Sequence, residues 1–126
     1  MTLHAYLVED SPVIRENLVD FLEDVAHAHV VASASTADEA LDWLSRHQRD
    51  WDLAIIDLFL QRGNGLAVIH ACRHRAPQQK VVVLSNYATA DMRLRSQQLG
   101  ADAFFDKSAE LDQLVAYCAT VQPSHG

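Results

Sequence analysis

Basic side chains are scarce in this chain of 126 residues. It has 10 Lys and Arg against 17 Asp and Glu, which gives a formal net charge of −7 at pH 7. A domain that binds nucleic acid needs a basic face toward the phosphates, so this deficit argues against direct DNA binding. It argues equally against a polybasic attachment to an anionic membrane.

Cysteine is rare, and long hydrophobic runs are missing. Cys72 and Cys118 are too few for a disulfide scaffold and lack metal-ligand spacing, so they are interpreted as small buried hydrophobic side chains. No apolar run approaches the ~20 residues of a membrane span. The N-terminus has no basic segment of the kind that begins a secretory peptide. We therefore expect a cytoplasmic protein.

The composition that remains is typical of one soluble globular domain. Hydrophobic residues make up 49% of the chain and charged residues 21%. The length suits one domain, since a domain takes roughly 100–200 residues. We expect the domain to span residues 1–121 and a short tail to span 122–126. The length leaves almost no room for an output domain, so a stand-alone module is expected.

Short apolar runs alternate with amphipathic segments along the whole chain. The predicted strands are residues 3–8, 30–34, 53–57, 80–85 and 103–105. The predicted helices are residues 12–26, 36–47, 66–76, 89–99 and 109–121. Nearly continuous apolar strands are typical of a parallel sheet that is covered on both faces. The pattern therefore predicts an α/β, (βα)₅, doubly wound fold.

Polar and charged side chains stand at the carboxyl ends of these strands, where open parallel sheets carry their sites. Glu9 and Asp10 follow the first strand, and Asp57 ends the third. Ser85 ends the fourth strand, and Lys107 follows the fifth. Three close carboxylates repel one another unless a cation lies among them. Oxygen ligands without His or Cys favour Mg²⁺.

These residues could divide the work of a phosphoryl transfer. Asp57 is the best candidate nucleophile, because a carboxylate can attack phosphorus and form an aspartyl phosphate. A metal ion would neutralise charge on the transferring group. Lys107 would hold one phosphoryl oxygen, and Ser85 would donate a hydrogen bond to another.

Together the motifs resemble the receiver domain of response regulators in two-component signalling. The resemblance spans residues 3–121 and implies a flavodoxin-like, five-stranded parallel sheet in the order 2-1-3-4-5. The matching positions are Glu9-Asp10, Asp57, Gly65, Ser85, Gly100-Ala101-Asp102 and Lys107.

The resemblance assigns a phosphoacceptor and a metal site. It makes Asp57 the phosphoacceptor. It implies that Mg²⁺ is held by Glu9, Asp10, Asp57 and the backbone carbonyl of Phe59. Within the acid pair, Asp10 would be the direct ligand and Glu9 would act through water.

The resemblance also assigns catalytic and switch roles. Lys107 and Ser85 would assist the phosphoryl transfer, and Ser85 and Phe104 would be the switch residues. Phe104 has no hydroxyl, so a switch there must work by ring packing. Ser108 stands after Lys107, where proline is usual in the family. A cis Lys–Ser bond would cost about 2.5–4 kcal/mol, which leaves the orientation of Lys107 open.

The implied partners are proteins. A histidine kinase or phosphotransfer protein would supply the phosphoryl group. A downstream target would bind the surface of the predicted helix 89–99, strand 103–105 and helix 109–121. A homodimer through the same surface stays open.

Two other functions are weighed against this one. The first is a receiver-like interaction module that works without phosphorylation. The second is a true enzyme on a related fold, which the residues disfavour. The acidic loop Glu9-Asp10 would repel a flavin or nucleotide phosphate, and Phe59 stands where a phosphohydrolase would carry a second acid. We therefore expect no enzyme activity beyond assistance to the domain's own phosphorylation and dephosphorylation.

Two aromatic residues are expected beside the phosphoryl site. Phe59 and Tyr87 follow the third and fourth predicted strands and would flank the phosphoacceptor with apolar bulk. We hypothesise that they hinder an attacking water molecule. A slowly hydrolysing phosphoryl group would be the result.

Overall fold

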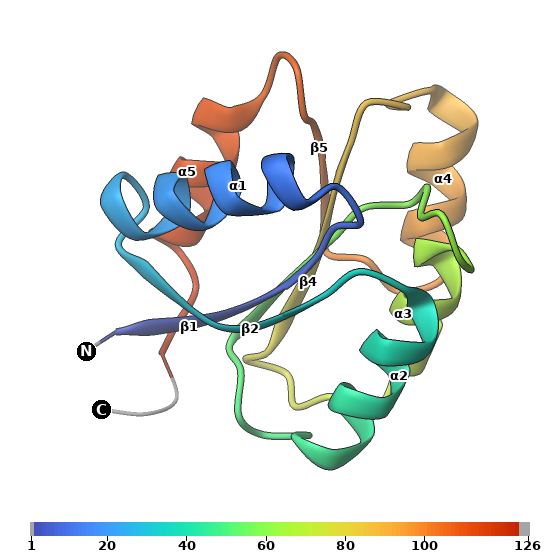
Figure 1. Cartoon of the computed structure of the whole chain (residues 1–126), viewed down its shortest axis with the longest axis horizontal. Coiled ribbons are helices and arrows are strands. Elements are labelled where there is room, and N and C mark those ends of the chain that lie inside the picture. Colours follow the sequence, from blue (N-terminus) through green and yellow to red (C-terminus); the bar gives the residue numbers. More distant parts are fainter. Residues whose placement is uncertain (1, 124–126) are drawn as a thin grey trace.

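The computed structural model describes residues 2–123, which alternate between strands and helices (Figure 1). The strands are β1 (Leu3–Val8), β2 (Ala28–Ala34), β3 (Leu53–Ile56), β4 (Lys80–Ser85) and β5 (Ala103–Asp106). The helices are α1 (Pro12–Asp24), α2 (Ala37–Arg46), α3 (Gly65–Ala71), α4 (Ala90–Gln98) and α5 (Leu111–Cys118). Within this range all strands pair in parallel in the order β2-β1-β3-β4-β5. The predicted flavodoxin-like (βα)₅ fold is confirmed. Residues 124–126 of the predicted tail lie outside the described residues.

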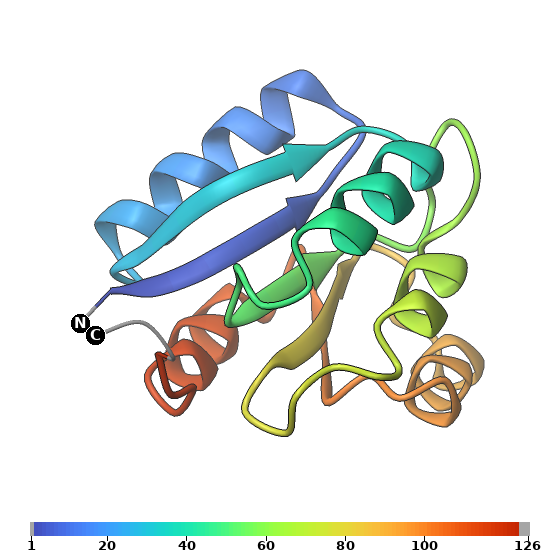
Figure 2. The same ribbon diagram turned by 90° about the horizontal axis from the view of Figure 1, so that it is seen from below.

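Two hydrophobic clusters cover opposite faces of the sheet. Helices α1 and α5 lie on one face, and α2, α3 and α4 lie on the other (Figure 2). Successive residues of a strand point to opposite faces, so Tyr6 packs into the second of these layers and Leu7 into the first. The strands read as continuously apolar because both of their faces are covered.

Side-chain caps begin four of the helices just beyond the strand ends. Each cap is a Ser, Thr or Asn whose side-chain oxygen accepts a hydrogen bond from a backbone N–H three residues on, which satisfies one unpaired donor of the first turn. The capping residues are Ser11, Thr36, Asn64 and Thr89. Helix α5 differs, because its N-cap residue Glu110 makes no side-chain cap bond.

The third helix is shorter than the sequence predicts. The structure ends α3 at Ala71, whereas the apolar spacing predicts a helix up to the residue before Pro77. Proline disfavours the helical conformation of the preceding residue. The Arg75 guanidinium also donates to the carbonyls of Cys72 and Gln79, which stabilises a turn instead of a further helical turn.

Smaller differences occur at other element ends. Helix α1 ends at Asp24, and the chain reverses at His27, whose φ of 54° lies in the left-handed region. Strand β2 begins at Ala28, two residues before the predicted start. Helix α5 begins at Leu111 rather than residue 109, because the residues before it form a turn that is described below. No helix within residues 2–123 is long and apolar enough to cross a membrane.

Candidate functional site

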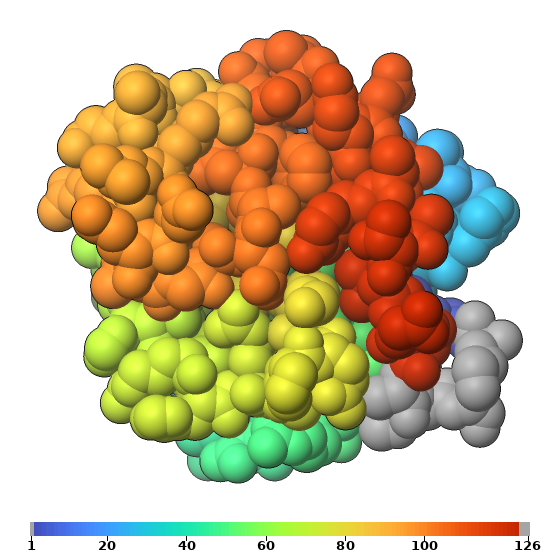
Figure 3. All heavy atoms as spheres, turned by 180° about the vertical axis from the view of Figure 1, so that it is seen from behind, coloured from blue at the N-terminus to red at the C-terminus, as the bar shows by residue number. Residues whose placement is uncertain are grey.

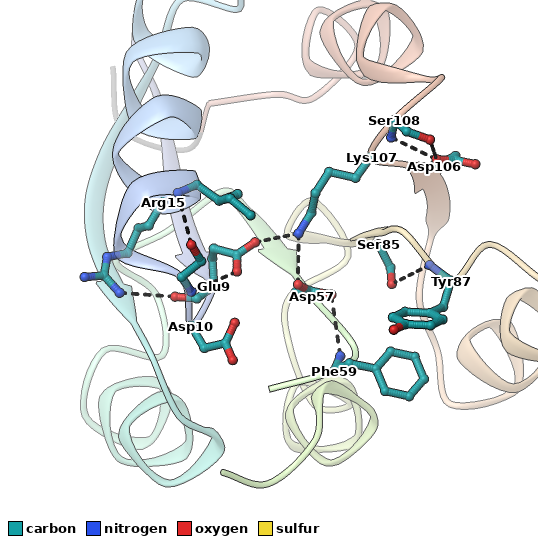
Figure 4. Close-up of polar contacts among 12 residues, drawn as sticks. Glu9, Asp10, Arg15, Asp57, Phe59, Ser85, Tyr87, Asp106, Lys107 and Ser108 are labelled. Atoms are coloured by element: carbon teal, nitrogen blue, oxygen red, sulfur yellow. Dashed lines mark hydrogen bonds and ion pairs between the residues drawn. The ribbon is translucent and has the colours of Figure 1, made fainter. Parts of the chain in front are cut away.

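Three carboxylates meet at the carboxyl ends of β1 and β3 (Figure 4). Val8 pairs with Ile56, so the residues that follow these two strand ends are neighbours. The Asp57 N–H donates to the Val8 carbonyl at 3.0 Å, which continues the sheet by one bond. Each of Glu9, Asp10 and Asp57 offers an oxygen, and these three oxygens all lie within 4.8 Å of one another.

Lys107 reaches this cluster from the loop after β5. Its Nζ donates to Glu9 Oε1 at 2.6 Å and to Asp57 Oδ2 at 2.9 Å. The side chains of Glu9, Asp57 and Lys107 are 2%, 12% and 11% exposed. One ammonium therefore compensates two largely buried carboxylates, in surroundings where an unpaired charge would be costly.

Burial and ion pairing act on the pKa values in opposite directions. Burial raises the pKa of the Glu9 carboxyl, and hydrogen bonds from the Lys107 ammonium and the Ser11 N–H offset this only in part. Burial lowers the pKa of Lys107, but its hydrogen bonds to Glu9 and Asp57 outweigh this, so its pKa is raised. The lysine stays charged, while the carboxylates still exceed it in number. The cluster therefore favours a further cation.

The loop after β3 closes over the acids through two backbone contacts. The Gln61 N–H donates to Asp10 Oδ2 at 2.8 Å, and the Gly65 N–H donates to the Leu58 carbonyl at 2.8 Å. A Cβ atom at Gly65 would lie 2.8 Å from Leu58 Cα and 2.9 Å from the Asp57 carbonyl carbon. Glycine is required here because the start of α3 lies directly against the backbone of Asp57.

Ser85 and two aromatic residues lie at the β4 side of the site. Ser85 is buried at the end of β4, and its Oγ accepts from the Tyr87 N–H at 3.2 Å. The Phe59 N–H donates to Asp57 Oδ1 at 3.5 Å. The Phe59 and Tyr87 rings are 49% and 57% exposed, with centroids 4.3 Å apart and planes inclined by 53°. We call these two residues the aromatic pair (Figure 4).

The last two predicted features lie on β5 and after it. Phe104 is partly buried, and the Arg93 guanidinium lies over its ring at 5.0 Å from the centroid. All peptide bonds in the described part of the chain are trans, so the bond between Lys107 and Ser108 is trans. Asp106 Oδ1 accepts from the Ser108 N–H at 2.8 Å and from its Oγ at 2.7 Å.

Arg15 is a neighbour of the site that sequence reasoning missed. Its Nη1 donates to the Glu9 carbonyl at 3.2 Å and to Ser35 Oγ at 2.6 Å, so it joins the residues that follow β1 and β2. Its signal in the sequence is faint: a single basic residue one helical turn after the cap Ser11. The contact between Arg93 and Glu110 was not predicted from the sequence either, and it is described below.

Comparison with known proteins identifies the family. Residues 5–119 match the response regulator receiver domain family. The chain is therefore a member of that family, whose domains are signalling modules that are generally phosphorylated on an aspartate. The resemblance drawn from the sequence is confirmed.

Named relatives agree with this assignment. The chain is 34% identical over 108 residues to the alginate biosynthesis transcriptional regulatory protein AlgB of Pseudomonas aeruginosa. It is 29% identical over 108 residues to the photosynthetic apparatus regulatory protein RegA of Rhodobacter capsulatus. Each match covers 86% of this chain, but only 23% of AlgB and 56% of RegA.

A solved structure shows the same fold. The crystal structure of a two-component response regulator of the LuxR family from Aurantimonas sp. SI85-9A1 has a TM-score of 0.80 and 25% identity. The match covers 98% of this chain and 89% of that chain. The likeness therefore extends over nearly the whole of both chains.

Proposed function

We propose that Asp57 accepts a phosphoryl group from a phosphohistidine of a histidine kinase or phosphotransfer protein. The observation that carries the proposal is the bridge of Lys107 between Asp57 and Glu9. A carboxylate beside a fixed ammonium can attack phosphorus while the ammonium stabilises charge on the transferring group. Membership of the receiver domain family supports the same role.

The transfer balances as a simple displacement. An Asp57 carboxylate oxygen forms a bond to phosphorus as the bond from phosphorus to the imidazole nitrogen breaks. The bonding electron pair stays on that nitrogen, and the donor leaves as a neutral histidine when its other ring nitrogen carries the proton. Lys107 moves its hydrogen bond from the carboxylate to a phosphoryl oxygen, and the Ser85 hydroxyl donates a hydrogen bond to another and keeps its proton.

The donor set of the cluster fits a magnesium ion. Carboxylate and carbonyl oxygens are the ligands that Mg²⁺ prefers, and three carboxylate oxygens lie within 4.8 Å of one another. In this proposal Glu9, Asp10, Asp57 and the backbone carbonyl of Phe59 hold the ion. When bound, Mg²⁺ neutralises negative charge on the phosphoryl group.

The output of the proposed reaction is a changed protein-binding surface. Helices α4 and α5 flank β5, and residues from about 90 to 120 form one continuous face of the molecule (Figure 3). Phe104 on β5 contacts α4 through Arg93, and Ser85 lies at the end of the neighbouring strand β4. A downstream protein would bind this face when Asp57 is phosphorylated.

Chemical phosphorylation tests the proposal directly. The protein is incubated with acetyl phosphate and Mg²⁺, and its intact mass is measured. We expect a gain of one phosphoryl group that is lost in Asp57→Asn and absent with EDTA. Asp20→Asn, which removes an exposed acid on α1, is the matched control and should retain the gain. If no phosphodonor, including phosphohistidine proteins, gives an adduct, the phosphorylation-independent interaction module becomes the better assignment.

A further inference from the structure

The Glu110 carboxylate joins three elements at one oxygen atom. Its Oε1 accepts from the backbone N–H of Asp106 at 2.8 Å and from Nη2 of Arg93 at 2.8 Å. Asp106 is the last residue of β5, Glu110 precedes the first residue of α5, and Arg93 belongs to α4. This one oxygen therefore connects the end of β5, just before Lys107, with helix α4.

Arg93 fixes α4 to β5 by two further contacts. Its Nη1 donates to the Phe104 carbonyl at 3.2 Å. Its guanidinium carbon lies 5.0 Å from the centroid of the Phe104 ring, within the range of a cation–π interaction. A planar guanidinium with five donors can make all of these contacts at once, whereas the single ammonium of a lysine cannot.

The turn around Lys107 is held by side chains on both sides. Asp106 Oδ1 accepts from the N–H and the hydroxyl of Ser108 at 2.8 and 2.7 Å. The Lys107 N–H donates to the Ser85 carbonyl at 3.0 Å. The position of the Lys107 ammonium therefore depends on the turn from Asp106 to Glu110. Glu110 in turn is bonded to Arg93.

Charge at this turn is favourable in the folded protein. The hydrogen bond from Arg93 lowers the pKa of Glu110, and the hydrogen bonds from Ser108 lower the pKa of Asp106. Both carboxyls are thus ionised at neutral pH. The bridge between Glu110 and Arg93 is charge-assisted, which makes it stronger than a neutral hydrogen bond.

Helix α4 buries little of its surface, although Met92 is partly buried against a hydrophobic cluster. Of its nine residues, all of which the structure describes, only Ser96 is buried. A helix that buries little apolar surface responds readily to a change at its few polar contacts. The bonds of Arg93 to β5 and Glu110 are therefore well placed to set its position.

We propose that Arg93 and Glu110 are positioning residues that couple the Lys107 turn to α4. This inference rests on the proposed function. A phosphoryl group on Asp57 adds oxygens and negative charge beside Nζ of Lys107. The ammonium follows these oxygens, the turn from Asp106 to Glu110 shifts with it, and Glu110 passes the shift to Arg93 and α4.

Hydrogen–deuterium exchange with the phosphoryl mimic beryllofluoride and Mg²⁺ tests this coupling. In the unmodified protein we expect the adduct to change the exchange rates of the α4 amides. Arg93→Met and Glu110→Ala should each reduce that change by about two- to thirtyfold, the span of typical coupling energies. Glu110→Gln should retain most of it, because the amide oxygen can accept both hydrogen bonds. Arg95→Met, which removes an exposed arginine of the same helix, is the matched control and should retain it fully.

A double variant separates coupling from simple loss of stability. If the two residues act as one link, Arg93→Met with Glu110→Ala should reduce the change no further than the stronger single variant. Thermal unfolding establishes that each variant is folded. The change in exchange around Asp57 on addition of beryllofluoride measures adduct formation separately from the response of α4.

The outcomes distinguish the coupling from the proposed function. An adduct that leaves α4 exchange unchanged in the unmodified protein would overturn the coupling alone. The coupling would also be overturned if Arg93→Met kept the full change in α4 exchange rates, or if Arg95→Met lost as much of this change as Arg93→Met. Failure of the unmodified protein to form an adduct with beryllofluoride, acetyl phosphate or a phosphohistidine protein would overturn both the proposed function and the coupling.

Discussion

The Lys107 ammonium lies closer to Glu9 than to Asp57, at 2.6 Å against 2.9 Å. Glu9 is the more deeply buried of the two acids. Glu9 therefore holds the Lys107 ammonium beside Asp57, and the two carboxylates share its positive charge. In the proposed transfer, an incoming phosphoryl group would meet an ammonium that is already in place, so little reorganisation would be needed at the moment of transfer.

Removal of the Lys107 charge should expose the repulsion among the acids. Lys107→Met leaves Glu9 and Asp57 largely buried without a cation, and loss of one partner of a buried pair costs about 3 kcal/mol or more. We expect the free energy of unfolding in EDTA to fall by about this amount. Saturating Mg²⁺ should restore part of it. Urea unfolding with EDTA and with Mg²⁺ measures both effects.

A second lysine provides the control for this prediction. Lys80 lies in β4, away from the carboxylate cluster. Lys80→Met should change stability equally with and without Mg²⁺. If Mg²⁺ stabilises Lys107→Met no more than the unmodified protein, the carboxylates do not form a site in which the lysine and the metal share the compensation of charge.

The aromatic pair should set the lifetime of the phosphoryl group. The rings of Phe59 and Tyr87 contact each other beside Asp57, so each ring supports the other. In the shielding hypothesis, they cover the path of an attacking water molecule. Phe59→Asn with Tyr87→Glu should speed dephosphorylation by about two- to tenfold, the rate equivalent of one aromatic contact. Loss of the phosphoryl mass over time measures this. The dephosphorylation rate of each single variant should lie between the rates of the unmodified protein and the double variant. An unchanged rate in the double variant would refute the shielding.

A methyl group at Gly65 should distort the phosphoacceptor. It would press on the backbone of Asp57 and Leu58, and backbone cannot move as a flexible side chain can. We expect Gly65→Ala to destabilise the protein by about 1–3 kcal/mol and to slow phosphorylation by acetyl phosphate. Gly100→Ala is the matched control, because its Cβ would make only an ordinary contact, 4.0 Å from Arg75 Nη1, and only its φ of 106° is strained. It should lower stability but leave the phosphorylation rate of the folded protein unchanged.

Alkaline pH should destabilise the protein through its cysteines. Burial raises the pKa of Cys72 and of Cys118 to about 11, from an ordinary value near 9. The unfolded chain ionises first, so the stability contributed by the neutral thiols is complete below pH 9 and is lost as the pH rises toward 11. Each thiol should account for about 2 kcal/mol of lost stability at pH 10.5.

Urea unfolding at pH 8 and pH 10.5 measures this loss. The double variant Cys72→Val with Cys118→Val should lose much less stability between the two values. Burial also raises the pKa of the Tyr6 phenol, so a smaller loss should remain in that variant. Equal losses in both proteins would show that the thiols ionise without unfolding.

The fold could be read from the sequence because both faces of the sheet are covered. That arrangement makes the middle of a strand such as β4 apolar from Val81 to Leu84, and the helices alternate regularly with the strands. The end of α3 could not be read in this way. It depends on Arg75, whose guanidinium bonds to carbonyls and to Asp102 across 27 positions of sequence. A long-range polar contact leaves no periodic trace in a sequence.

The candidate site likewise has features that the sequence predicts and features that it does not. Asp57, Glu9 and Asp10 were found because strand ends of a parallel sheet converge, and topology alone brings such residues together. The deep burial of Glu9 and its pairing with Lys107 follow from packing, which the sequence does not display. The contact between Arg93 and Glu110 could not be predicted for a further reason. Surface charges of opposite sign are common, and only the three-dimensional structure shows which of them are in contact.

The sparse burial of α4 separates most of the surface of this helix from the hydrophobic clusters. Six of its nine residues are exposed, whereas Met92 packs against a hydrophobic cluster, Arg93 contacts β5, and Ser96 is enclosed. Substitutions at the six exposed positions should cost little folding free energy. If α4 belongs to the binding surface proposed above, substitutions at its exposed positions can change the partner while the proposed phosphoacceptor site at the ends of β1 and β3 stays the same.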